Sequence, residues 1–258
     1  MARFLNDAHA PIALFDSGVG GIGVLREVKK LLPSEQFLYF GDTKNAPYGE
    51  RSRVEILGLV KRAAAELLPC VKALVLACNT ATAVAASELR STYPDRLIIG
   101  MEPALAPAVR ETRKAHARIL VLATAATLRE ERFALLCQKY EKSATVWPFS
   151  APGIVRLVEA GLSDSAEMDA YLRTIAMRLP DAPDAIVLGC THFPFARNAL
   201  RRVFGSIPLY DGASGTAREL RRQLQLRGLL NTADTDGGTT IFASDPRSLP
   251  LLSNLYTK

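Results

Sequence analysis

The chain has 258 residues, of which 48% are hydrophobic, 22% charged and 7% aromatic. This is the composition of a globular protein, and it excludes disordered, collagen-like and coiled-coil chains. The formal net charge of +6 raises the question of nucleic acid. Basic residues never run longer than two, however, and no zinc-finger or RNP pattern accompanies them. We therefore expect no nucleic-acid partner.

The four cysteines and the N-terminal segment bear on the compartment. The cysteines include no CxxC pair, so they predict neither a disulfide scaffold nor a structural zinc site. The first residues lack the apolar region of a signal peptide, and no apolar run approaches the roughly 18 residues that cross a membrane. We expect a cytoplasmic protein with free thiols and no membrane partner.

Apolar runs typical of buried strands alternate along the chain with segments of helical periodicity. This alternation predicts an α/β fold built from parallel sheets, in which ligands gather at the carboxyl ends of the strands. Strands are expected at residues 12–15, 37–40, 73–77, 97–99, 118–122, 144–147, 185–188, 209–210 and 240–242. Helices are expected at residues 24–32, 52–68, 80–89, 127–140, 154–161, 166–179, 194–203 and 216–226.

An internal repeat predicts two related halves. Residues 73–80 read ALVLACNT and residues 185–192 read AIVLGCTH, so that each segment is a strand, a small residue, a cysteine and two polar residues. The two cysteines are 112 residues apart, and the strands that open each half are 106 residues apart. We expect a first α/β domain of residues 1–99 with 211–258, and a second of residues 100–210, with Pro103 and Pro107 in the crossover.

A glycine-rich turn satisfies one known motif. Gly18 to Gly23 read GVGGIG after a strand and before a helix, and Asp42 lies 19 residues further on, which is the pattern of a dinucleotide site. Asp16, however, directs a carboxylate toward the helix N-terminus where a pyrophosphate would bind. A tight turn is the simpler interpretation, and an NAD-binding dehydrogenase is the alternative.

Cys78 and Cys190 each follow a buried strand, just ahead of an expected helix N-terminus. Such a position lowers the pKa of a thiol. His192 adjoins Cys190 and is expected to hold the proton of that thiol or to polarise the substrate. Asp16 is the matching polar group for Cys78. The remaining two cysteines, Cys70 and Cys137, are interpreted as structural core residues.

Two thiols that face each other across a cleft suit a racemase or an epimerase. Such an enzyme needs one group to remove a proton from a carbon and a second group to return a proton on the other face. A cysteine hydrolase that uses Cys190 and His192 is an alternative, but it leaves Cys78 without a role. Tyr48 lies in a long loop, where it is either an anchor for a small substrate or part of a simple turn.

Four motifs together carry a family resemblance: FDSGVGG at 15–21, DTKNAPYGERS at 42–52, LACNTA at 76–81 and LGCTHFP at 188–194. With TTIFASDP in the tail, they make the chain similar to the glutamate racemases of the aspartate/glutamate racemase superfamily. The resemblance implies two pseudo-symmetric α/β domains with an active site in the cleft between them. It also implies interconversion of L- and D-glutamate without cofactor or metal, which supplies D-glutamate for peptidoglycan.

The same resemblance assigns roles to residues. Cys78 would act on D-glutamate and Cys190 on L-glutamate, with Asp16 and His192 assisting their respective thiols and Glu159 as a further acidic residue near the second thiol. Aspartate or a related amino acid is the alternative substrate, and the sequence does not distinguish a monomer from a homodimer. The segment that opens the second half, with Thr124 and Thr127, departs from the family pattern at Ala123. The residues that would hold the amino acid are Asp16, Ser17, Tyr48, Gly49, Asn79, Thr80, Thr124, Thr191 and His192.

Overall fold

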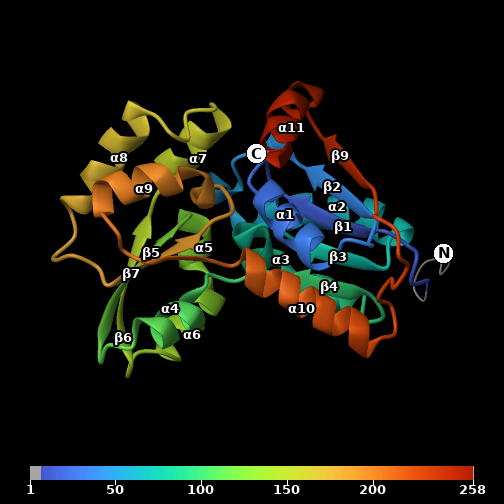
Figure 1. Ribbon diagram of the computed structural model, residues 1–258, viewed down its shortest axis with the longest axis horizontal. Coiled ribbons are helices and arrows are strands. Elements are labelled where there is room, and N and C mark those ends of the chain that lie inside the picture. The colour runs from blue at the N-terminus through green and yellow to red at the C-terminus, as the bar shows by residue number, and fades with distance from the viewer. Residues whose placement is uncertain (1–6, 258) are drawn as a thin grey trace. The chain divides into compact units, whose positions relative to one another are not determined.

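A computed structural model describes residues 7–257. The chain divides into two compact units, each with its own parallel sheet and its own helices (Figure 1). Unit 1 comprises the residues up to Met101 together with those from Ala213 onward, and unit 2 comprises Glu102–Gly212. Within the described part of the chain, every helix is too short or too polar to cross a membrane.

The sheet of unit 1 contains five strands in the order β4-β3-β1-β2-β9, and all neighbouring strands are parallel. Every residue of the central strand β1 and of its neighbour β3 is buried, as expected for strands that are covered on both faces. The strands are β1 (Ile12–Asp16), β2 (Phe37–Gly41), β3 (Ala73–Leu76), β4 (Leu97–Gly100) and β9 (Thr239–Ala243).

Helices cover both faces of this sheet because the chain reverses its direction across it. The crossover from β1 to β2 moves toward one edge of the sheet, whereas the crossovers from β2 to β3 and from β3 to β4 move toward the other edge. Right-handed connections therefore place α1 on one face and α2 and α3 on the opposite face. Helix α10 packs against α1, and α2 packs against α3 (Figure 1). The helices are α1 (Ile22–Leu31), α2 (Arg53–Leu67), α3 (Asn79–Thr92), α10 (Ala213–Leu226) and α11 (Leu249–Thr257), with the 3₁₀ turns η1 (Thr43–Asn45), η2 (Tyr48–Glu50), η3 (Leu68–Cys70) and η5 (Pro246–Ser248).

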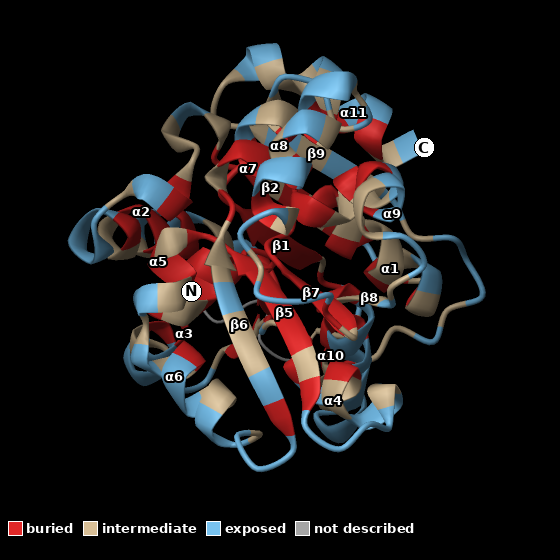
Figure 2. Cartoon of the chain, turned by 90° about the vertical axis from the view of Figure 1, so that its left-hand side faces the viewer, coloured by how far each residue is buried: buried red, intermediate tan, exposed pale blue. Residues whose placement is uncertain are grey.

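Unit 2 repeats this architecture. Its sheet has the order β6-β5-β7-β8, and read from the other end it matches β4-β3-β1-β2 of unit 1. Strands β5 and β7 are buried, whereas the edge strand β6 is half exposed (Figure 2). The elements are β5 (Ala117–Ala123), β6 (Ala144–Ser150), β7 (Ala185–Gly189), β8 (Leu209–Asp211), α4 (Leu105–Thr112), α5 (Ala125–Arg129), α6 (Glu131–Gln138), α7 (Pro152–Glu159), α8 (Ala166–Ala176), η4 (Phe193–Ala196) and α9 (Arg197–Phe204).

The C-terminal tail belongs to unit 1. All five residues of β9 pair with β2, and α11 packs against α1 and β9. A fully buried ion pair fixes the segment that leads to β9: the Nζ of Lys72 lies 2.5 Å from a carboxylate oxygen of Glu35 and donates to the carbonyl of Leu229 at 2.9 Å. The other carboxylate oxygen of Glu35 accepts from the amide of Asn231 at 2.9 Å.

One predicted helix is wrong in form. The segment 127–140 forms two helices, α5 and α6, instead of one. Glu130 lies between them with an extended backbone, at a ψ of 138°, and serves as the C-cap of the first helix and the N-cap of the second. The apolar residues of segment 127–140 are spaced as in a continuous helix, because a single extended residue leaves the periodic pattern almost unchanged.

Other predictions missed elements or misplaced a residue. The segment around Pro107, which was expected to be a crossover, forms α4, and Pro107 is tolerated because first-turn amides need no intrahelical acceptor. Helix α11 at the end of the chain was not predicted. Cys70 is exposed and is therefore not a core residue, since the turn η3 brings it to the surface.

Candidate active site

The thiol of Cys78 is held at the end of β3, where α3 begins. Cys78 is the N-cap residue of α3, and its Sγ accepts a hydrogen bond from the amide of Ala81 at 3.4 Å. The same sulfur lies 3.4 Å from the hydroxyl oxygen of Ser17, to which its S–H donates. Cys78 therefore lies at the helix N-terminus that the sequence predicted, where backbone amides stabilise negative charge.

Asp16 ends β1 and is fully buried. Its Oδ1 accepts from the amide of Gly18 at 2.7 Å. A Cβ at Gly21 would lie 2.7 Å from the Cβ of Asp16, so only glycine fits beside this side chain. The glycine-rich turn thus fits around a carboxylate at the start of α1. Such a charge opposes a pyrophosphate at that place, which argues against the dehydrogenase alternative.

Asn79 and Thr80, the first two residues of α3, are buried beside Cys78. Both polar atoms of the Asn79 side-chain amide are buried without a hydrogen-bond partner among the described residues. An unsatisfied buried amide costs about 1–3 kcal/mol, so a native structure rarely leaves one without a purpose. The amide is therefore available to a ligand that carries both donors and acceptors.

The loop after β2 brings Tyr48 to the same cluster. The hydroxyl of Tyr48 donates to Oδ2 of Asp42 at 2.6 Å, and the amide of Asn45 binds both oxygens of that carboxylate. Burial and the Asp42 carboxylate raise the pKa of Tyr48 far above its usual range, with smaller contributions from Cys78 and Asp16. Tyr48 therefore keeps its proton. Together, the residues Asp16, Ser17, Tyr48, Gly49, Cys78, Asn79 and Thr80 form what we call the first thiol cluster.

Sequence reasoning did not name Asp42 as a member of this site. It treated Asp42 only as the acidic residue of the dinucleotide motif, whereas the structure places it on Tyr48 and Asn45. The amide of Asp42 donates to the carbonyl of Asp16 at 2.9 Å, so the two acids end adjacent strands at one edge of the sheet. That adjacency of β1 and β2 is the signal that could have found it.

The thiol of Cys190 follows β7, which corresponds to β3 in the strand order. Its surroundings differ from the prediction, because the α-helix does not begin at residue 194. The turn η4 comes first, with His192 as its N-cap residue, and α9 begins only at Arg197. The side-chain partner of the sulfur is therefore His192, whose Nδ1 lies 3.7 Å from Sγ.

His192 is buried and contacts a carboxylate on its far side. Its Nε2 lies 2.6 Å from Oε1 of Glu159, the last residue of α7. Burial acts to lower the pKa of His192, but hydrogen bonds to Cys190 and Glu159 outweigh burial and raise this pKa well above its usual value. The contacts with Cys190 and Glu159 therefore favour the protonated form of the imidazole.

Thr124 and Thr191 complete this group. Thr124 follows β5 and is the N-cap residue of α5, where its hydroxyl accepts from the amide of Thr127 at 3.1 Å. Ala123 pairs with Gly189 across the sheet, so Thr124 lies at the same sheet edge as Cys190. We call Thr124, Glu159, Cys190, Thr191 and His192 the second thiol cluster. Ala123 occupies the position that Asp16 holds in unit 1, and α7 supplies the carboxylate instead.

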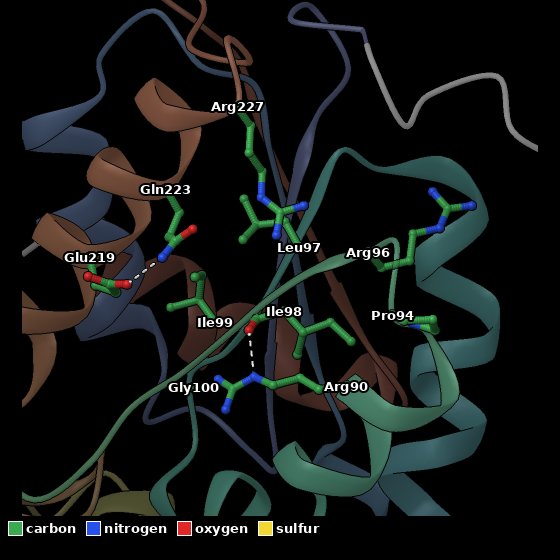
Figure 3. Close-up of a pocket in the computed structure, with 10 residues that line it drawn as sticks. All are labelled: Arg90, Pro94, Arg96, Leu97, Ile98, Ile99, Gly100, Glu219, Gln223 and Arg227. Atoms are coloured by element: carbon green, nitrogen blue, oxygen red, sulfur yellow. Dashed lines mark hydrogen bonds between the residues drawn. The ribbon is translucent and has the colours of Figure 1, made fainter.

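A separate pocket of about 440 Å³ lies between β4 and α10 in unit 1 (Figure 3). It is lined by arginines that include Arg90 and Arg227, but also by Glu219. Hydrogen bonds from Arg222 lower the pKa of Glu219 to about 2, so this carboxylate is ionised at neutral pH. A negative charge among these arginines disfavours the binding of a polyanion in this pocket. Within residues 7–257, no three His, Cys, Asp or Glu side chains gather as metal ligands would.

The fold and the two clusters define an α/β protein that carries one thiol at equivalent strand ends of two similar units. The sequence matches the family model described as Asp/Glu/Hydantoin racemase over residues 32–220, and the chain belongs to that family. A glutamate racemase from Clostridium acetobutylicum is 43% identical over 236 residues, which are 91% of each chain. The glutamate racemase from Thermus thermophilus, solved with β-chloro-D-alanine, is 35% identical with a TM-score of 0.79 and covers 98% of this chain and 94% of its own. The Escherichia coli glutamate racemase, solved with L-glutamate and the activator UDP-MurNAc-Ala, is 30% identical with a TM-score of 0.79 and covers 95% of both chains.

Proposed function

We propose that this protein interconverts L-glutamate and D-glutamate by proton transfer at the α-carbon, with two thiols and no cofactor. The observation that carries the proposal is that Cys78 and Cys190 follow corresponding strands, β3 and β7, of two sheets with the same strand order. A hydrolase would need only one of these thiols. The relatives named above, which are glutamate racemases, support glutamate as the substrate.

In the proposed reaction from L-glutamate, the Cys190 thiolate takes the α-proton, and the Cys78 S–H donates its proton to the opposite face of the same carbon. The product is D-glutamate, and the enzyme is left with a Cys190 thiol and a Cys78 thiolate. This is the state that the reverse reaction requires. Protonated His192 stabilises the Cys190 thiolate, while Ser17 and the Ala81 amide stabilise the Cys78 thiolate.

The polar residues of the clusters would hold the amino acid. The unsatisfied amide of Asn79 can accept from the substrate ammonium and donate to a carboxylate. Ser17, Thr80, Thr124 and Thr191 offer hydroxyl donors to the two carboxylates; Tyr48, Gly49, Asp16 and His192 are the remaining proposed contacts. By its family resemblance, we place this activity in the cytoplasm as a supply of D-glutamate for peptidoglycan.

Chiral analysis of the products tests the proposal. The purified protein is incubated separately with L-glutamate and with L-aspartate, without nicotinamide, pyridoxal phosphate or added metal. We expect D-glutamate to form until the two enantiomers are equal, and aspartate to react much more slowly. Faster turnover of aspartate would show the alternative specificity, and no turnover of either amino acid would refute the proposed activity.

A further inference from the structure

The C-terminal tail contacts the loop that carries Tyr48. Strand β9 ends at Ala243, which pairs with Gly41 at the end of β2. The next tail residue, Ser244, donates its amide hydrogen to the carbonyl of Gly41 at 3.0 Å. The tail therefore leaves the sheet where the loop of residues 42–51, which we call the Tyr48 loop, begins.

Two hydrogen bonds join the tail to the turn η1 in this loop. The hydroxyl of Ser244 accepts from the amide of Lys44 at 2.9 Å, and the hydroxyl of Thr43 accepts from the amide of Asp245 at 3.2 Å. The positive charge of Lys44 also contributes to lowering the pKa of Asp245, after the larger effect of Arg247. The tail thus binds η1 at two successive residues, Thr43 and Lys44.

Asp42, the N-cap residue of η1, holds the Tyr48 hydroxyl. The backbone amide of Asn45 donates to the carbonyl of Asp42 at 3.0 Å, and its side-chain amide donates to the Asp42 carboxylate. That carboxylate accepts from Tyr48 at 2.6 Å. The guanidinium of Arg51 closes the loop by donating to the carbonyl of Asn45 at 2.7 Å. Hydrogen bonds therefore run from Ser244 through η1 and Asp42 to Tyr48.

We propose that Ser244 is a positioning residue for the first thiol cluster, and that its hydroxyl fixes η1 and thereby the Tyr48 loop against the substrate. This inference rests on the proposed function. The hydroxyl is not needed to hold the tail, because β9 keeps its five pairs with β2 and α11 keeps its contacts with α1. Lys44 is exposed, so water can satisfy its amide when the hydroxyl is removed. Removal should loosen the loop and leave the fold intact.

Kinetics of Ser244→Ala test the role in the reaction. The loss of one neutral hydrogen bond in a substrate-holding loop should raise the KM for L-glutamate about threefold to tenfold, with a change in kcat of less than about twofold. Ser244→Thr keeps the hydroxyl and should restore the KM. Ser248→Ala, a change at a half-buried serine of the same tail, should behave as the wild type. In a Tyr48→Phe background the effect of Ser244→Ala should largely disappear, because both changes act through one side chain.

Hydrogen exchange gives a readout that does not depend on activity. Peptides that cover residues 42–51 should exchange faster in Ser244→Ala than in the wild type or in Ser248→Ala, at an unchanged melting temperature. An unchanged exchange rate in this loop, or an equal rise in KM in the Tyr48→Phe background, would overturn the inference. If the wild type fails to racemise glutamate, the proposed function fails, while the exchange experiment still decides whether Ser244 orders the loop.

Discussion

The imidazole of His192 bridges a carboxylate and a thiol: its Nε2 lies 2.6 Å from Glu159 and its Nδ1 lies 3.7 Å from Cys190. The bridge joins the end of α7 to the segment after β7. His192 is almost fully buried, and a buried charge is stable only when it is paired and hydrogen-bonded. Together with Cys190, Glu159 therefore favours the protonated form of this histidine.

Replacing Glu159 by Gln should narrow the pH range of activity. The carboxylate is one of the two groups that raise the pKa of His192, so its loss lowers this pKa. Protonated His192 is required in the proposed mechanism and is lost as the pH rises through its pKa. The alkaline limb of the kcat/KM profile should thus move to lower pH by about one unit or more. An alkaline limb at the wild-type position would contradict this role, and Glu131→Gln, at an exposed position on α6, is the control.

Each cluster thiol should be essential, whereas the other two cysteines should be dispensable. Cys78→Ser and Cys190→Ser should each lower kcat about 10²- to 10⁴-fold, because a serine hydroxyl is a far weaker acid than a thiol. Cys70→Ser and Cys137→Ser are matched controls at an exposed and a half-buried position, and they should retain most activity. Racemisation at the wild-type rate by either cluster variant would exclude the two-thiol mechanism.

Asp42→Asn should weaken substrate binding through Tyr48. The carboxylate accepts from Tyr48 and from Asn45, and a neutral amide binds such donors less strongly. We expect kcat/KM for glutamate to fall about tenfold, mainly through KM. A Tyr48→Phe variant should show a similar fall, and the double variant should lose little more. Additive losses in the double variant would show that the two residues act separately. Asp95→Asn, at an exposed position, serves as the control.

The buried pair of Lys72 and Glu35 should matter for stability. Lys72→Ala leaves the Glu35 carboxylate buried without its cation, and such a loss costs about 3–5 kcal/mol of the free energy of unfolding. Lys61→Ala, which breaks a half-exposed pair with Glu88, should cost about 1 kcal/mol or less. Urea denaturation followed by circular dichroism measures both values. An equal loss of unfolding free energy in the two variants would show that the buried pair stabilises the fold no more than the half-exposed pair does.

The sequence allowed prediction of the strand positions and of the two cluster thiols by residue number, but not of the strand order within each sheet. Buried parallel strands appear as continuous apolar runs, and β1, β3, β5 and β7 were found in this way. The repeat around the two cysteines indicated that β3 and β7 correspond to each other. The strand order of the two sheets supports this correspondence.

What sequence reasoning missed depends on contacts between distant segments or on single backbone angles. Asp42 lies beside Asp16 of the first thiol cluster because β2 pairs with β1, and Lys72 meets Glu35 because β2 and β3 both pair with β1. The turn η4 after Cys190 and the extended Glu130 between α5 and α6 change the chain locally without disturbing its hydrophobic period. Patterns of side-chain type do not report these features.

Deuterium incorporation in D₂O shows whether two thiols exchange protons on opposite faces of one carbon. L-glutamate is incubated with the protein without cofactor, and both enantiomers are isolated after a small fraction has reacted. We expect the D-glutamate to carry one deuterium at the α-carbon, and the remaining L-glutamate to keep its original hydrogen. D-glutamate that retains the hydrogen of the substrate would show that a single base serves both faces, and would contradict the two-thiol mechanism.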